Sequence, residues 1–545
     1  MSNPNRNLFL QLEKGLKAAL SIITAVFILL NLVSFMTAGE ERLINILEDD
    51  AYYYFTIARN LIQEGRLTFD GTTLTNGFQP LWFGMLLPIF GVIKDPLAAL
   101  RAVGILNTLL AGLAGYLGWL ALRKHSLIPF TIGMVLMQFC LVSFGITGME
   151  TGILLVLLMV CLLLIEKNQP WNLESLPYRQ AAGLSVCLGL LLLARLDSIW
   201  FILVFLGSLL LINGLKHLKP LVILSIGPVL TLFMYMLANQ VFFANWMPAS
   251  GSAKSLGSQF LEFNHLFLGQ CFGSDTFING NLWKVFGICF LFALGFLTLI
   301  LLRFMLRKRR PGSTNFQEFI LPGCISLSLV LFFLYSLFGS TWILFRWYGY
   351  LLLPMAIYVY PFVVEKIIHT LSTFTSFKRV LTGIGIILAL LACLPMIQTT
   401  INRGLWSYTL PPAFRYENFQ AAHFLNDSLP KNSLVAMGDR AGSFAYFYQG
   451  RVLQLEGLVG EEALLTAIQN NTLAEYMTGF SVDYVLTYWD PPDGYNRWTL
   501  LTPLPGFSVG PQAGIDLCKD REVMRFVSAY QTLSTWEWPG CADNQ

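Results

Sequence analysis

The first 400 residues alternate long apolar stretches with short polar ones. The apolar stretches are each about 20 residues long, the length that a helix needs to cross a bilayer. This pattern predicts eleven spanning helices, at residues 18–38, 98–122, 127–145, 149–165, 180–199, 200–214, 220–243, 284–303, 318–338, 347–364 and 380–400. The predicted fold class is a polytopic α-helical membrane protein, with residues 1–400 as its transmembrane domain.

The last part of the chain, residues 401–545, follows a different pattern. Helical periodicity at residues 417–429 and 461–480 alternates with strand-like runs at 434–437, 482–488 and 525–530. Such alternation is typical of a small α/β domain. We therefore expect a C-terminal α/β domain after the last span.

The apolar run at residues 78–93 is too short to span comfortably and contains Pro80 and Pro88. If it lies in the outer interface instead, the basic residues between spans fall on one side, including the Arg123-Lys124 pair and the cluster at 307–310. Positive residues favour the cytoplasmic side of a membrane. The N-terminus is therefore predicted to be cytoplasmic, with the first loop (39–97) and the tail (401–545) outside.

Composition supports a membrane protein and excludes other classes. Of 545 residues, 55% are hydrophobic and 12% are charged, against about 25% charged in soluble domains. A net charge of +3 gives no reason to expect nucleic acid as a partner. The nine cysteines include no zinc-binding spacing. In the tail, Cys518 and Cys541 form a disulfide or remain two separate thiols, and both alternatives stay open.

The first loop carries the densest group of polar residues. Glu48, Asp49 and Asp50 precede a stretch with one apolar face, which predicts a helix over residues 50–64. One interpretation of the three carboxylates is helix capping and a favourable interaction with the helix dipole. Because three exceed what a cap requires, a general base or a metal ligand is the alternative.

Other ionisable residues lie at the predicted outside ends of spans. Glu150 starts the fourth span, and Arg195 and Asp197 end the fifth. Lys254 and Arg346 lie in later outside loops. Helix packing would explain the Arg195–Asp197 pair, a snorkelling lysine would explain Lys254, and an interfacial belt would explain Arg346. Taken together, three cations suit a phosphate held at the bilayer surface.

A carboxylate facing those cations would suit proton removal from an attacking hydroxyl. Aromatic side chains of the first loop, Tyr53 and Trp82 among them, would suit stacking on sugar rings. These interpretations concern the same outside face of the membrane.

Part of the sequence resembles a known family. The first loop resembles that of the GT-C superfamily of glycosyltransferases, which includes protein O-mannosyltransferases, aminoarabinose transferases and arabinofuranosyltransferases. The strings that carry this resemblance are Asp49-Asp50-Ala51-Tyr52, Ala58-Arg59-Asn60-Leu61, Thr75-Asn76-Gly77-Phe78 and Pro80-Leu81-Trp82, with Gly65 and Phe69 between them. The tail, through residues 438–442 and 451–458, resembles the C-terminal extracytoplasmic domain of bacterial members.

The resemblance implies a multi-pass enzyme of the bacterial cytoplasmic membrane. Its donor would be a polyprenyl-phosphate-linked sugar. A hydroxyl of a glycan, lipid or protein acceptor would attack the anomeric carbon of that sugar on the outer face, with inversion at that carbon. Asp49 would be the general base, and Asp50 would orient the acceptor or hold a divalent cation. Substrate-binding candidates are Tyr53, Arg59, Asn76, Gln79, Trp82, Glu150, Arg195, Asp197, Lys254, Arg346 and Tyr348. Asp50 stands where some subfamilies carry Glu, which leaves metal use open.

Three other functions remain as alternatives. A ligase would move a whole glycan from a lipid diphosphate. A transporter or flippase would show interrupted helices and midplane charges, whereas the ionisable groups here lie at span ends. A surface receptor would not need eleven spans.

Overall fold

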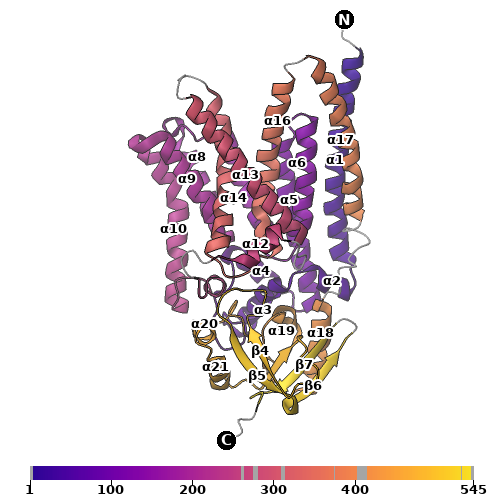
Figure 1. The fold of residues 1–545 in the computed structure, drawn as a ribbon, viewed down its shortest axis with the longest axis vertical. Helices are drawn as coiled ribbons and strands as arrows, with labels where there is room; N and C mark the ends of the chain where they lie inside the picture. The colour runs from indigo at the N-terminus through magenta and orange to yellow at the C-terminus, as the bar shows by residue number, and fades with distance from the viewer. Residues whose placement is uncertain are drawn as a thin grey trace.

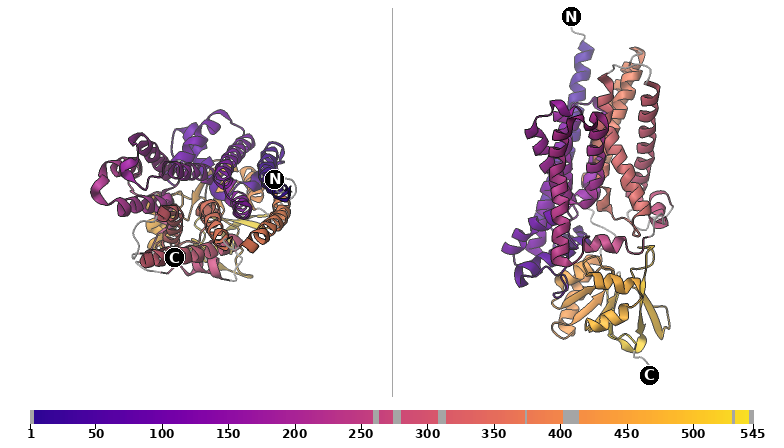
Figure 2. Two further views of the ribbon diagram at one scale, coloured as in Figure 1. Left: turned by 90° about the horizontal axis from the view of Figure 1, so that it is seen from above. Right: turned by 90° about the vertical axis from the view of Figure 1, so that its left-hand side faces the viewer.

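The long helices form one bundle, and the C-terminal domain covers one end of it (Figure 1). This computed structural model describes residues 4–258, 263–273, 280–307, 314–372, 375–401, 414–528 and 531–541. Helix α1 (Pro4–Thr37) begins at the end of the bundle remote from the C-terminal domain, and the molecule is elongated along this direction (Figure 2). The predicted start of the tail at residue 401 is followed by residues 402–413, which lie outside the described residues, as do residues 308–310 of the basic cluster.

Within the described residues, ten helical segments are long and apolar enough to cross a membrane, which confirms a polytopic membrane protein. Besides α1 they are α5 (Pro96–Leu122), α6 (Leu127–Cys140) with the turn Leu141–Gly145, α7 (Thr151–Asn168), α9 (Ile199–Asn213), α10 (Leu218–Phe243), α13 (Gly280–Arg307), α14 (Ile320–Phe338), the segment Arg346–Leu371 that ends in α16 (Tyr360–Leu371), and α17 (Thr375–Ile401).

The remaining predicted span, at 180–199, corresponds to a shorter helix, α8 (Tyr178–Ala194), of 17 residues. The helix ends early because Arg195 adopts an extended backbone conformation. Helix α7 begins next to Glu150, and Arg195 Nη1 lies 2.7 Å from Glu150 Oε1. Because α8 therefore returns the chain to the level at which α7 began, it makes the eleventh pass.

The first loop contains three helices. Helices α3 (Asp49–Glu64) and α4 (Pro80–Val92) match the two that the sequence predicts, while the seven-residue α2 (Glu40–Ile46) is too short for a periodic signal. Helix α3 ends at Gly65, whose φ of 72° suits glycine. The turn at Asp70 is closed mainly by its own carboxylate, which accepts from the backbone N–H groups of Thr72 and Thr73.

The C-terminal domain is built on a five-stranded mixed sheet in the order β2-β1-β3-β7-β6. Strands β2 (Arg451–Gln454), β1 (Leu434–Met437) and β3 (Tyr484–Thr487) are parallel, and β7 (Thr532–Glu537) runs antiparallel to both β3 and β6 (Glu522–Val527). Strands β4 (Arg497–Thr502) and β5 (Ala513–Cys518) form a separate antiparallel pair. The α/β class of the tail is thereby confirmed.

Two tail predictions need correction. The helix expected at 461–480 is two helices, α20 (Glu462–Gln469) and α21 (Leu473–Gly479), because Asn471 at φ 54° turns the chain between them. The strand expected at 525–530 is β6, which starts earlier and ends at Val527, while residues 529 and 530 lie outside the described residues.

Cys518 and Cys541 form a disulfide. This was one of the two alternatives that the sequence left open. Disulfides persist in oxidising compartments, so the bond accords with an extracytoplasmic tail.

The tail domain is held on the first loop by hydrogen bonds between residues far apart in sequence. Helix α19 (Ala441–Phe447) presents its first amides to Asp49: Gly442 N lies 3.0 Å from Oδ2, and Ser443 N lies 2.8 Å from Oδ1. The Ser443 hydroxyl donates to the same Oδ1 at 2.5 Å. A Cβ on Gly442 would lie 2.2 Å from the Asp49 carbonyl oxygen, so only glycine allows this approach.

We therefore expect Gly442→Ala to detach the tail domain from the first loop. The added methyl group would clash with backbone, and such overpacking costs about 1–3 kcal/mol or more. Limited proteolysis of the full-length protein in detergent should release the tail faster. Gly479→Ala is the control, because a Cβ at Gly479 meets no atom within 4 Å. Equal cleavage rates for the two variants would contradict this account of the interface.

Candidate functional site

The two aspartates at the start of α3 have different surroundings. Asp49 is 9% exposed, and its two carboxylate oxygens accept the three hydrogen bonds from α19. Asp50 is one residue further along and points in another direction, since successive residues of a helix are about 100° apart. Among the described residues, no hydrogen bond or ion pair occupies its carboxylate. The expectation that Asp49 is the base therefore fits this geometry poorly, because its oxygens are already engaged.

The environment of Asp50 favours a base that works near neutral pH. Burial raises the pKa of Asp50 to about 7; Lys254 opposes that rise, and the charges of Asp49, Glu150 and Asp439 add to it. A general base is most effective when its pKa lies near the working pH.

A cavity of about 330 Å³ opens among α9, α10 and α14 at the end of the bundle that carries the tail. One part of its lining is polar: Gln79, Arg195, Asp197, Lys254 and Tyr348. The rest is largely apolar and aromatic: Trp200, Leu232, Tyr235, Met236, Trp246, Phe332 and Tyr335. A cavity of this shape suits a ligand with a charged head and a hydrocarbon chain.

Two of the cations that the sequence predicts, Arg195 and Lys254, line this cavity. They differ in whether a carboxylate neutralises them. The Arg195 guanidinium pairs with Glu150 Oε1 at 2.7 Å and with Asp197 Oδ2 at 2.8 Å. Lys254 Nζ instead donates to the Tyr348 hydroxyl at 2.7 Å. Burial acts to lower the pKa of Lys254, but Tyr348 and Asp50 outweigh it and raise that pKa above its ordinary value. Lys254 therefore stays protonated, and no carboxylate forms an ion pair with it where the chain is described.

Two further candidates shape the polar end. The Asn76 side chain accepts from Ala249 N at 2.8 Å and donates to the Met247 carbonyl at 3.2 Å, and so holds the short helix α11 (Ala249–Lys254). Asn76 thus positions Lys254. Gln79 lines the cavity, and its buried Oε1 has no hydrogen-bond partner within the described residues, so it can accept from a ligand hydroxyl.

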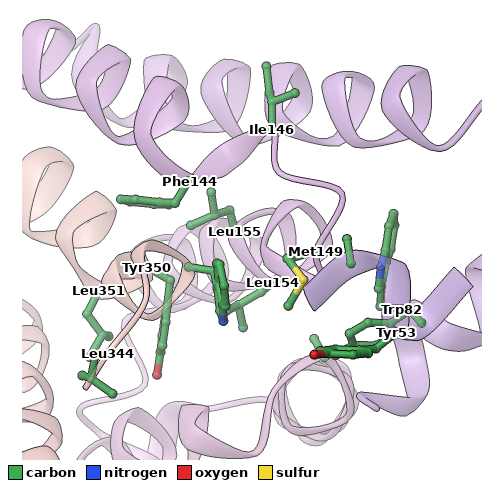
Figure 3. Packing of buried hydrophobic residues seen from close by; sticks show 14 of the residues in the cluster. Tyr53, Trp82, Phe144, Ile146, Met149, Leu154, Leu155, Leu344, Tyr350 and Leu351 are labelled. Atoms are coloured by element: carbon green, nitrogen blue, oxygen red, sulfur yellow. The ribbon is translucent and has the colours of Figure 1, made fainter. Parts of the chain in front are cut away.

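The remaining candidates lie away from this cavity. Trp82 is completely buried and donates to the Gly148 carbonyl, and Tyr53 packs edge-on against Phe69, so neither offers a free ring face for stacking (Figure 3). Arg346 forms an ion pair with Glu48, and Arg59 donates to the Tyr446 carbonyl at 2.7 Å. The substrate-binding roles expected for Trp82, Tyr53 and Arg346 stay predictions, and the contacts described above show what these side chains do within the protein.

Two carboxylates of the tail belong to the same charged environment and were not assigned a role from the sequence. Burial raises the pKa of Asp439, Arg440 lowers it, and Asp49 raises it. Burial also raises the pKa of Glu456, and Asp439, Asp50 and Asp49 add to that rise. Asp439 lies in the string 438–442, and Glu456 lies in the string 451–458. The resemblance of these two strings to the tail of bacterial members of the superfamily was the signal in the sequence that could have pointed to both residues. Where the structure is described, no three His, Cys, Asp or Glu side chains form a group that could hold a metal ion.

The chain is similar to one family model and to several solved structures. Residues 409–540 match a family model described as a domain of unknown function, DUF8728. No curated protein sequence matches the chain. Two crystal structures of ArnT from Cupriavidus metallidurans, one bound to undecaprenyl phosphate and one in the apo state, are similar over 94% of this chain and 97% of theirs, with 10% and 11% identity and TM-scores of 0.46 and 0.48.

An oligosaccharyltransferase from Archaeoglobus fulgidus, in a complex with Zn and sulfate, is similar over 86% of this chain and 67% of its own, with 12% identity and a TM-score of 0.44. At such scores and identities these likenesses assign no role to any residue of this chain.

The buried ion pairs of Arg195 with Glu150 and Asp197 provide a test of its structural role. We expect Arg195→Met to lower the free energy of unfolding by about 3–5 kcal/mol, because it leaves the Glu150 and Asp197 carboxylates without their cation. The control is Arg521→Met, which removes an exposed ion pair with Glu537 and should cost about 1 kcal/mol or less. Thermal unfolding in detergent provides the comparison; similar losses in the two variants would contradict the structural role of Arg195.

Proposed function

We propose that this protein is an integral-membrane glycosyltransferase that moves a sugar from a polyprenyl-phosphate donor to an acceptor hydroxyl, with Asp50 as the general base. The observation that carries the proposal is a protonated Lys254 at a cavity with apolar walls, close enough to interact electrostatically with the Asp50 carboxylate, which has no partner among the described residues. We place the reaction on the extracytoplasmic face, because the tail that covers this end contains a disulfide.

The donor fits the cavity in two parts. Its phosphate would lie against the Lys254 ammonium, and its polyprenyl chain would lie along Trp200, Leu232 and Tyr335, which belong to membrane-spanning helices. The unpartnered Gln79 Oε1 would accept a hydrogen bond from a sugar hydroxyl. One uncompensated cation suits a monophosphate better than a diphosphate, which favours this donor over that of a ligase.

The reaction follows from the positions of the two charges. The acceptor oxygen forms a bond to the anomeric carbon while the bond from that carbon to the phosphate oxygen breaks. The acceptor proton passes to the Asp50 carboxylate, and the bonding electron pair leaves with the phosphate. Because the leaving phosphate gains negative charge, Lys254 stabilises the transition state more than the ground state. Attack from the side opposite the leaving group inverts the anomeric centre.

Asp49 has a supporting role in this proposal. Its carboxylate fixes α19, and α19 directly follows the turn that carries Asp439. Asp49 thereby holds the tail carboxylates beside Asp50, and it adds its own negative charge to those that raise the Asp50 pKa.

The central test compares the two neighbouring aspartates. Asp50→Asn should lower transfer from a polyprenyl-phospho-sugar by about 10²–10⁴-fold, because the amide cannot accept the proton. Asp49→Asn should retain measurable transfer while weakening the attachment of the tail. Transfer of radiolabelled sugar in reconstituted membranes measures both, at matched amounts of folded protein. If Asp49→Asn loses transfer and Asp50→Asn keeps it, the assignment is reversed.

The pH dependence of transfer gives an independent test. Because the base must be deprotonated, kcat/KM should fall as pH decreases through about 7, the Asp50 pKa. Asp439→Asn removes a nearby negative charge that raises this pKa, so the midpoint of the profile should move to lower pH. Asp493→Asn, in the tail but with no such effect on Asp50, is the matched control. A profile that is flat between pH 5 and 8, as a range about the Asp50 pKa, would refute Asp50 as the base.

A further inference from the structure

A second cavity lies between the first loop and the tail domain, and we call it the seam cleft. It has a volume of about 590 Å³. Its walls come from α3, from the residues around the start of α5, and from the tail. The side chains that matter below are Thr56, Arg59, Glu64, Phe419, His423 and Arg451. The seam cleft shares no lining residue with the cavity that contains Lys254.

A buried hydroxyl in the wall of the seam cleft lacks a partner. Thr56 is 2% exposed, and its Oγ1 makes no hydrogen bond within the described residues. Buried polar side-chain atoms in folded proteins nearly always have a partner, so each exception asks for an explanation. A ligand in the seam cleft that offers a hydroxyl to Thr56 would supply the missing bond.

The lining favours a hydroxyl-rich and uncharged ligand. Charges of both signs are present, with Arg59 and Arg451 on one hand and Glu64 on the other. The Phe419 and His423 rings line the wall, with their centroids 4.3 Å apart and their planes tilted by 53°. Aromatic faces combined with many donors and acceptors match a carbohydrate, which has apolar C–H faces and many hydroxyls.

Helix α19 connects the seam cleft with the proposed reaction site. Its first amides bind Asp49, beside Asp50, and its last residues, Ala445 to Phe447, line the seam cleft. Seven helical residues span about 10 Å. The two sites therefore lie about 10 Å apart, within reach of one chain-like ligand that has a hydroxyl at Asp50.

We infer that the seam cleft binds the carbohydrate chain of the acceptor, at a distance from the hydroxyl that reacts. This inference rests on the proposed function, because it takes the acceptor to be a glycan. It assigns acceptor recognition jointly to the first loop and the tail domain. Thr56 is a binding residue in this account, and it has no part in the chemical step.

The experiment uses the full-length protein in lipid nanodiscs. The probe is the carbohydrate fraction released by mild acid from the envelope of the cells that make the protein, with a fluorescent label at the reducing end. Fluorescence anisotropy measures its affinity without any donor present, and hydrogen exchange maps its position. We expect slower exchange in residues 419–426 and 445–452 when the probe is bound.

The test variant is Thr56→Val, which removes the hydroxyl and keeps the shape. Because this hydroxyl has no partner in the described part of the chain, its removal should leave folding nearly unchanged. The affinity for the probe should fall about fivefold, the equivalent of one hydrogen bond. Thr131→Val is the control, since Thr131 in α6 also has a buried hydroxyl without a partner among the described residues and should leave binding unchanged.

The outcomes separate this inference from the proposed function. No binding by the wild-type protein, equal affinities of wild type and Thr56→Val, or protection confined to other segments would each overturn the seam cleft as an acceptor site. Loss of transfer in Asp50→Asn together with any of these results would leave the proposed function standing. Binding at the seam cleft with full transfer by Asp50→Asn would overturn the proposed base and keep the cleft.

Discussion

The hydrogen bonds between Asp49 and the first amides of α19 are the interaction on which the proposed site depends. They join residues 393 and 394 positions apart in sequence and place the tail domain against the start of α3. A buried carboxylate that accepts backbone N–H bonds at a helix start gains both hydrogen-bond and dipole energy. Because Asp49 is held in this way, the adjacent Asp50 has no partner among the residues that the structure describes and lies near the carboxylates of the tail.

This arrangement explains why two neighbouring aspartates can act differently. The tail contributes Asp439, whose charge helps to raise the Asp50 pKa, and helix α11 contributes Lys254, which opposes the rise. The first loop, α11 and the tail thus set one pKa together. In the proposed mechanism, the membrane domain supplies the donor cavity, and the tail adjusts the base and borders the acceptor.

The sequence was most informative where structure is local. The spans follow from about 20 apolar residues each, and α3 and α4 follow from periodicity and proline placement, so their prediction needed no knowledge of neighbours. Helix α8 ended early because Arg195 turns to Glu150, a partner 45 residues away. The division of residues 461–480 depended on a positive φ at Asn471, which the sequence alone did not reveal.

The candidate site was predictable only in part, because it depends on contacts between residues that are far apart in sequence. The sequence pointed to the first-loop carboxylates and to Lys254, Arg195, Gln79 and Tyr348, and five of the predicted residues line one cavity, these four among them. It could not show that Glu48 engages Arg346, or that Asp49 is bound by the tail while Asp50 is free. Those distinctions arise from contacts between segments that are hundreds of residues apart.

The claim that most needs direct measurement is the position of the donor phosphate. Cryo-electron microscopy of the full-length protein in nanodiscs containing polyprenyl phosphate would locate it. The account predicts phosphate density within hydrogen-bond distance of Lys254 Nζ, with the hydrocarbon chain lying along Trp200 and Tyr335. Phosphate density at another part of the membrane surface, with the Lys254 cavity empty, would contradict it.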